Sequence, residues 1–205
     1  MTMNILHIDS SILGPNSVSR QLSADVVARL AAVTPGAAIT YRDLAETPVP
    51  HLSGGYIAAA QNPDATHASA VQDDLATGGA VLGEFLTADT VVIGVALYNF
   101  TVPSQLKAWI DRVLVAGQTF RYGANGAEGL AGDKRVILAI ARGGFYHAGA
   151  PAAAFEHAET YLRTVFGFIG VDKLEVVIAE GLAVGPEQRA AAIAGAQQQI
   201  TAIAA

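Results

Sequence analysis

The sequence contains no cysteine, and only 15% of its 205 residues carry a charge. Without cysteine there is no disulfide, no thiolate nucleophile and no cysteine-bound metal. The formal net charge of −6 argues against nucleic acid or an anionic membrane surface as the main partner. No apolar run approaches the roughly 20 residues of a membrane span. The N-terminal segment MTMNILHIDSS has no basic stretch, so we expect a cytoplasmic protein rather than a secreted one.

Several motifs of catalysis are also missing. The chain has no Gly-x-Gly-x-x-Gly for a dinucleotide and no Gly-Lys-Ser/Thr for a nucleoside triphosphate. It has no Gly-x-Ser-x-Gly nucleophile elbow. His51, His67 and His157 lack metal-ligand spacing, and His7 lies in an apolar run that favours a core position. We therefore expect no metal site and disfavour a hydrolase.

Hydrophobic residues, in contrast, make up 52% of the chain, and many gather in short runs. Unbroken apolar runs are typical of parallel strands covered on both faces, and they occur here at 3–8, 38–44, 89–98, 134–141 and 173–181. Helical periodicity is found between and after them, at 17–33, 67–86, from 103 onward, at 152–166 and at 187–203.

This alternation predicts one α/β domain over residues 1–205. The expected architecture is a doubly wound, five-stranded parallel sheet in the order 2-1-3-4-5, with helices on both faces. The connection at 43–66 is rich in proline and glycine, and we expect it to be an excursion near the site.

Three unusual loops follow strands that would be neighbours in this sheet. SSILGPNSVS follows the first strand, LYNFTVPSQ the third and ARGGFYHAG the fourth. Ligands of open parallel sheets bind beyond the carboxyl ends of the strands, where the strand order reverses. The three loops are therefore predicted to form one site, which argues against a purely structural module.

Serine hydroxyls dominate the first loop. A helix is predicted to begin near Ser17, and its first N–H groups have no partner within the helix. These N–H groups and the hydroxyls of Ser11, Ser17 and Ser19 are suited to holding a phosphate. An ordinary helix cap at Ser17 explains the pattern equally well. Because the loop has no lysine, a monoester phosphate fits better than a triphosphate, and FMN is the leading candidate.

The other two loops suit a flat ring. Tyr98 and Phe100 are placed to flank a planar ligand while Asn99 addresses its polar edge, although two aromatics that close the core explain LYNF as well. Gly143 and Gly144 permit close backbone approach to a ligand, and their alternative is a plain turn.

The segments SSIL, NSVSRQLS, LYNFTVPSQLKAWID, TFRYGANGAEGL, ARGG and FGFIG, together with EG and GPE, resemble the FMN-dependent NADH-azoreductase family. These are flavodoxin-like NAD(P)H:quinone oxidoreductases, and the resemblance runs from residue 4 to about residue 190. It implies a flavodoxin-like fold, bound FMN, NADH or NADPH as electron donor, and a homodimer with its active sites at the interface.

The resemblance also implies site residues. The expected FMN contacts are Ser11, Ser17, Val18, Ser19, Leu97, Tyr98, Asn99, Phe100, Ala141, Arg142, Gly143 and Gly144. The residues expected around the substrate pocket are Tyr122, Phe166 and Phe168. Many relatives have methionine at the position of Leu97 and serine or threonine at that of Ala141. We assign no catalytic duty to His147, because its surroundings in FYHAG differ from those in the relatives. No other side chain is assigned one, because the resemblance implies that the hydride chemistry takes place on N5 of the flavin.

The activity that the resemblance implies is two-electron, ping-pong reduction of quinones and azo compounds. The alternative is an FMN electron carrier without a small-molecule substrate of its own. The mild charge and the extra segments at 43–66 and 118–132 favour the enzyme. Asp111 and Arg112 are expected on a helix surface or at the dimer interface.

Overall fold

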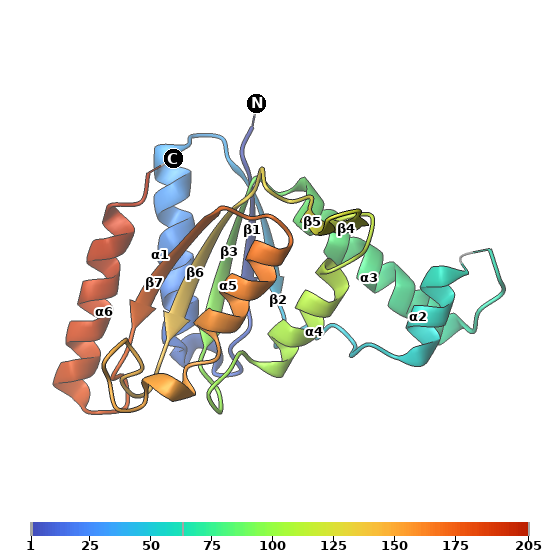
Figure 1. The fold of residues 1–205 in the computed structure, drawn as a ribbon. Helices are drawn as coiled ribbons and strands as arrows, with labels where there is room; N and C mark the ends of the chain where they lie inside the picture. Colours follow the sequence, from blue (N-terminus) through green and yellow to red (C-terminus); the bar gives the residue numbers. More distant parts are fainter. Residues whose placement is uncertain (1, 63, 205) are drawn as a thin grey trace.

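The computed structural model describes residues 2–62 and 64–204. Its centre is a parallel sheet in the order β2-β1-β3-β6-β7, which is the predicted 2-1-3-4-5 arrangement (Figure 1). The strands are β1 (Asn4–Asp9), β2 (Ala38–Asp43), β3 (Thr90–Ala96), β6 (Arg135–Ala141) and β7 (Lys173–Ala179). All five predicted strands are confirmed, with bounds that shift by at most two residues at either end.

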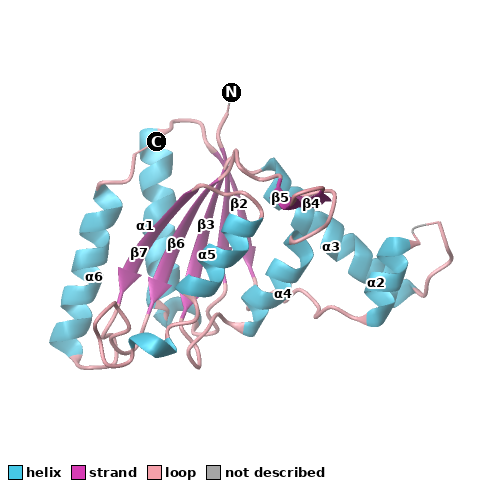
Figure 2. Ribbon diagram, in the orientation of Figure 1, coloured by secondary structure: helices cyan, strands magenta, loops and turns pink. Residues whose placement is uncertain are grey.

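Helices cover the sheet from both sides, as Figure 2 shows. One side carries α1 (Val18–Val33) and α6 (Pro186–Thr201), and the other carries α3 (Ser69–Thr87), α4 (Ser104–Val113) and α5 (Glu159–Phe168). Side chains of a strand point alternately to the two faces, so each central strand contributes to both hydrophobic clusters. The flavodoxin-like fold class is thereby confirmed.

Strand β2 departs from the expected double coverage. Ile39 and Tyr41 are 48% and 53% exposed, whereas every residue of β3 is buried. The reason is position, because β2 pairs only with β1 and ends the sheet beyond the helices that cover its centre.

The helix predicted at 152–166 begins later than expected. A 3-10 turn occupies Ala153–Phe155, and α5 starts at Glu159. The carboxylate of Glu156 accepts hydrogen bonds from the N–H groups of Ala158, Glu159 and Thr160 at 3.1, 2.9 and 3.2 Å. Because these are the donors that a helix start leaves free, Glu156 fixes where α5 begins.

The two extra segments are partly regular, which the sequence did not predict. The 43–66 connection contains α2 (Gly54–Gln61), which lies at the end of the molecule opposite α6 (Figure 1). Residues 118–132 contain a small hairpin of β4 (Phe120–Gly123) and β5 (Gly126–Gly129).

Arg112 anchors the first of these segments. Its Nη2 donates to Pro50 O and to Asp74 Oδ1, each at 2.8 Å, and its guanidinium lies 3.7 Å from the centre of the Tyr56 ring. The side chain is completely buried. The expected place on the helix surface is therefore wrong for Arg112, and its role is to hold α2 and the preceding loop against α3 and α4.

Within the residues that the structure describes, no helix is both long enough and apolar enough to span a membrane.

Candidate functional site at the carboxyl edge of the sheet

The three loops singled out in the sequence meet at one edge of the sheet, as predicted. Figure 1 shows the ends of the strand arrows and the loops that follow them along this edge. The Ser11 hydroxyl lies 2.8 Å from the Tyr98 hydroxyl and joins the first loop to the second. Leu97 N donates to Ala141 O at 2.9 Å and joins the second to the third. Beneath them, Ser10 Oγ donates to the carbonyl of Gly94 at 2.7 Å.

A cavity of about 260 Å³ lies between the three loops and the end of β7. Its lining residues are Ser11, Leu13, Asn16, Ser17, Val18, Ala96, Leu97, Tyr98, Ala141, Gly143, Leu182, Ala183 and Arg189. We call it the small cavity. Many of the predicted cofactor contacts are among these residues. Arg189 of α6 was not predicted, and it is the one arginine or lysine among the residues that line the small cavity.

A second cavity, of about 850 Å³, opens beside the first. It is lined by Ile12, His51, Leu97, Tyr98, Asn99, Thr101, Val102, Pro103, Ser104, Gln105, Lys107 and Tyr161. We call it the large cavity. Leu97 and Tyr98 line both cavities, so they form a wall that the two share. His51 brings the 43–66 connection to the site, as the sequence predicted for that segment.

Ser17 combines both roles considered for it. Its hydroxyl accepts the N–H of Arg20 at 3.3 Å and so caps α1, and it also faces the small cavity. Ser19 is buried and reaches Ser17 Oγ at 3.1 Å, so its side chain does not line the cavity. The N–H groups of Val18 and Ser19 open the helix and have no intrahelical acceptor. Hydroxyl and amide donors of this kind suit an anion.

The backbone of the second loop is left-handed at two residues that are not glycine. Asn99 has φ 47° and Phe100 has φ 72°, conformations that side chains with a Cβ seldom adopt. Two hydrogen bonds between Tyr98 and Thr101, of 3.0 and 3.1 Å, close the turn around them. Phe100 is 48% exposed and packs on Phe155, so the alternative in which it closes the core is wrong. Strain of this kind concentrates at functional sites.

Arg142, in the third loop, lines neither cavity. Its guanidinium is buried between Glu159 at 2.7 Å, Glu156 at 3.3 Å and Glu180 at 3.7 Å. The predicted cofactor contact is therefore wrong for its side chain, which instead ties the loop to α5 and β7. Burial alone would raise the pKa of the Glu180 carboxyl. The hydrogen bond from the N–H of Tyr146, together with His147 and Arg142, outweighs burial, so the pKa is lowered.

The predicted substrate-pocket residues line neither cavity of the single chain. Phe166 is 1% exposed and belongs to the hydrophobic core, so the structure does not place its ring at a pocket surface. Its place on α5 faces the sheet, which helical spacing alone could have shown. Tyr122 is 75% exposed on the hairpin, and Phe168 is partly exposed beside it. Both rings pack on Phe120, at centroid distances of 5.5 and 4.8 Å.

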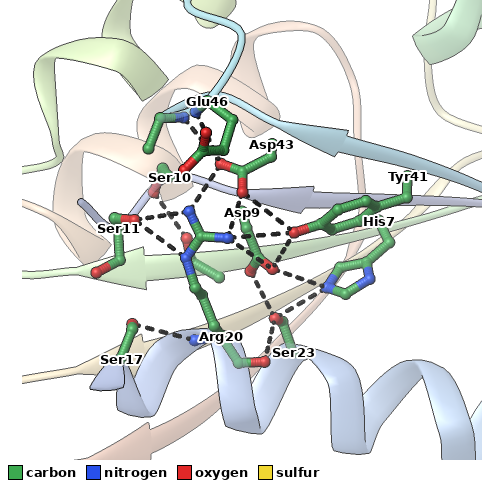
Figure 3. A network of polar contacts seen from close by, with 12 residues as sticks. His7, Asp9, Ser10, Ser11, Ser17, Arg20, Ser23, Tyr41, Asp43 and Glu46 are labelled. Atoms are coloured by element: carbon green, nitrogen blue, oxygen red, sulfur yellow. Dashed lines mark hydrogen bonds and ion pairs between the residues drawn. The ribbon is translucent and has the colours of Figure 1, made fainter. Parts of the chain in front are cut away.

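The sequence analysis also missed Arg20, which holds the first loop from below (Figure 3). Its Nε and Nη2 donate to the carbonyl of Ser11 at 3.0 and 2.8 Å. The same guanidinium pairs with both oxygens of Asp43, and the Nη2 to Oδ1 distance is 2.7 Å. These hydrogen bonds raise the pKa of Arg20 and lower that of Asp43. Arg20 therefore links the end of β2 to the loop that lines the small cavity.

Asp9 carries the second half of this network. It accepts hydrogen bonds from Ser23 Oγ at 2.8 Å and from the Tyr41 hydroxyl at 3.0 Å. His7 is buried and reaches Ser23 Oγ at 2.9 Å, which confirms the predicted core position. Burial, followed by the charge of Asp9, raises the pKa of Tyr41 to about 12. Gly94 leaves room for these groups, because a Cβ there would meet Asp9 and Ser23.

No group of three or more histidine, aspartate or glutamate side chains that could hold a metal ion occurs within residues 2–62 and 64–204.

Residues 3–204 match a family described as having the flavodoxin-like fold. FMN-dependent NADH:quinone oxidoreductase of Xanthomonas campestris pv. campestris is 65% identical over 202 residues, covering 98% of this chain and 99% of that protein. FMN-dependent NADH:quinone oxidoreductase 2 of Bradyrhizobium diazoefficiens is 60% identical over 203 residues, covering 99% and 100%.

Solved structures agree with these relatives. An azoreductase from Bacillus anthracis str. Sterne has a TM-score of 0.89 at 30% identity, with 98% of this chain and 97% of that chain covered. An FMN-dependent NADH-azoreductase from Bacillus anthracis str. Ames Ancestor, solved in complex with FMN, has a TM-score of 0.88 at 24% identity. At this identity the comparison supports the fold alone. With matches that span nearly its whole length, the chain belongs to the FMN-dependent NADH-azoreductase family of flavodoxin-like proteins.

Proposed function

We propose that this chain is an FMN-dependent oxidoreductase that uses NADH or NADPH to reduce quinones. The observation that carries the proposal is the pair of adjoining cavities. The small cavity offers hydroxyl, amide and arginine groups, and the large one, of about 850 Å³, has room for a planar substrate beside it. The names of the relatives in Xanthomonas and Bradyrhizobium state the same activity for those proteins.

The residues of the small cavity fit FMN. Hydroxyls of Ser11 and Ser17, the first N–H groups of α1 and the guanidinium of Arg189 would hold the phosphate. The segment from Leu97 to Phe100 would lie along the ring system, and the backbone at Gly143 would meet its polar edge. Ala141 has no hydroxyl to add. When bound, FMN would supply the two-electron redox chemistry that links the dinucleotide donor to the acceptor.

The chain itself supplies binding and orientation. In our proposal the large cavity receives the nicotinamide donor first and the acceptor second, which gives ping-pong kinetics without a separate dinucleotide motif. Its open, mixed lining would admit azo compounds as well as quinones, because both are flat and reducible. Tyr98, whose hydroxyl is held by Ser11, fixes the wall against which both substrates rest.

We further propose that residues 1–205 act as one domain and assemble as a homodimer with active sites at the interface. Several large apolar side chains are exposed beside the large cavity or on the hairpin and α5, which is unusual for a monomer. They are Ile12, Leu13, Phe100, Tyr122, Phe155 and Phe168. In the dimer, Tyr122 and Phe168 of one protomer would approach the cavity of its partner. A cytoplasmic location follows from the proposed donor, because NADH is supplied there.

The test is to purify the protein, load it with FMN and follow the visible flavin spectrum without oxygen. NADH should bleach the spectrum, a quinone should restore it, and the cycle should repeat at steady state. A protein that binds no FMN would refute the proposal. One that binds FMN but passes electrons to no quinone would instead support an electron carrier.

A further inference from the structure

The large cavity has a one-sided charge. None of its lining residues is aspartate or glutamate, although the chain as a whole carries a net charge of −6. Lys107 is the only lysine or arginine among the lining residues, and the side chains of His51 and Tyr161 can donate hydrogen bonds. The lining residues therefore carry no negative charge of their own and offer one cation for pairing.

Lys107 has a partner on its own helix that a ligand could replace. It lies on α4, is half exposed, and its Nζ is 2.6 Å from Asp111 Oδ1 one turn further along the helix. Exposed pairs at this spacing contribute little to stability, so Nζ can turn toward a stronger partner at small cost. Asp111 itself does not line the cavity.

Tyr161 stands beside Lys107 and keeps its proton. Burial raises the pKa of the Tyr161 phenol, the charge of Lys107 opposes that shift, and the charge of Asp111 adds to it. Tyr161 and Thr101 also line a neighbouring hollow of about 400 Å³ with His157, Thr160 and Thr164. The cavity wall next to Lys107 is therefore extended by hydroxyl groups, again without a carboxylate among the lining residues.

From this arrangement we infer that Lys107 makes the large cavity selective for planar ligands that carry an acidic group, with Tyr161 as a neutral hydrogen-bond donor beside it. The inference rests on the proposed function and adds a substrate class to it. Two sources share the chemistry, because the acid can be a carboxylate or sulfonate on the acceptor ring or the pyrophosphate of the dinucleotide donor.

The experiment uses the FMN-loaded protein and two acceptors, 1,4-naphthoquinone and its 2-sulfonate. Stopped-flow traces give the rate of each oxidative half-reaction and, separately, of reduction by NADH. The rate ratio of sulfonate to neutral quinone is compared between variants, because the intrinsic reactivities of the two quinones then cancel. Calorimetric titration with naphthalene-2-sulfonate measures anion binding without turnover.

Four variants make the test specific. Lys107→Met should lower the sulfonate-to-neutral ratio and the affinity for naphthalene-2-sulfonate about threefold to fivefold, the effect of one partly exposed charge pair. Lys107→Arg should restore most of both, and Asp111→Asn should raise both, because it releases Nζ from its competing partner. Lys173→Met is the matched control, since Lys173 begins β7 at the opposite edge of the sheet and should change neither.

The arms separate the possible outcomes. A loss confined to NADH reduction, with both acceptor measurements unchanged, would assign the acidic group to the donor. Unchanged ratios, affinity and NADH rate in Lys107→Met would overturn the inference while quinone turnover by the native protein upheld the proposed function. If no quinone were reduced at all, the proposed function would fail, and the calorimetric arm would still decide whether Lys107 binds an anion.

Discussion

Replacing Arg20 should weaken FMN binding more than it weakens riboflavin binding. Arg20 donates two hydrogen bonds to the Ser11 carbonyl and is held in turn by Asp43. Arg20→Gln removes that clamp and leaves Asp9 and Asp43 without their shared cation. Losing charge-assisted hydrogen bonds of this kind costs about 1.5–3 kcal/mol, which corresponds to a roughly tenfold to hundredfold rise in the FMN dissociation constant.

The assay titrates apoprotein with FMN and with riboflavin and follows the quenching of flavin fluorescence. Riboflavin lacks the phosphate, so its affinity should fall much less if Arg20 acts through the phosphate side of the site. Arg42→Gln is a matched control. Arg42 also lies near the sheet edge and pairs with Glu84 at 2.6 Å, its side chain is 16% exposed against 14% for Arg20, and it does not contact the first loop.

Two results would refute this reasoning. If FMN and riboflavin lost affinity equally, Arg20 would be supporting the fold rather than the phosphate loop. If Arg42→Gln reproduced the effect, general loss of stability would explain it, and thermal unfolding of the two variants measures that loss directly.

Three further predictions concern other arginines and the acid limb of stability. Arg189→Gln should raise the FMN dissociation constant about tenfold and leave riboflavin binding nearly unchanged in the same titration. Arg112→Met should lower the free energy of unfolding by about 3 kcal/mol in urea, with amide exchange increasing first in α2. In the folded chain the pKa of Asp43 lies below its ordinary value of 3.8. The ionised carboxylate therefore stabilises the fold above pH 3.8, and this contribution is lost as the pH falls through the lowered pKa of the folded state. Between about pH 6 and pH 3, Asp43→Asn should therefore lose less stability than the native chain in urea titrations.

The strands were predictable because their signals are local and strong, and their order because alternating strands and helices favour a doubly wound sheet. The run around β3 has no polar interruption, and every residue of the strand is buried. The three loops could be brought together because parallel strands end at a common edge. Polar side chains at the start of α1 marked the small cavity, since helix starts expose N–H groups whatever the rest of the fold does.

What the sequence did not reveal depends on partners far apart in the chain. Arg20 pairs with Asp43, and Arg112 with Asp74, so neither role can be predicted from neighbouring residues. Glu156 moved the start of α5 by capping it, although the alanines at 152–154 favour an earlier helix. Arg189 lines the small cavity because α6 packs beside α1. Helical periodicity predicts that α6 is a helix, but it does not predict which helix α6 packs against.

The wall of Leu97 and Tyr98 has a consequence for how this site can change over generations. Because the same two side chains border both cavities, a substitution that reshapes the room for one ligand alters the room for the other. Tyr98 is further bound to Ser11, so its replacement also loosens the opposite loop. New substrate preferences should therefore arise first at positions that border the large cavity but not the small one, such as His51, Gln105 and Tyr161. A change of side-chain size in the shared wall should require compensating substitutions.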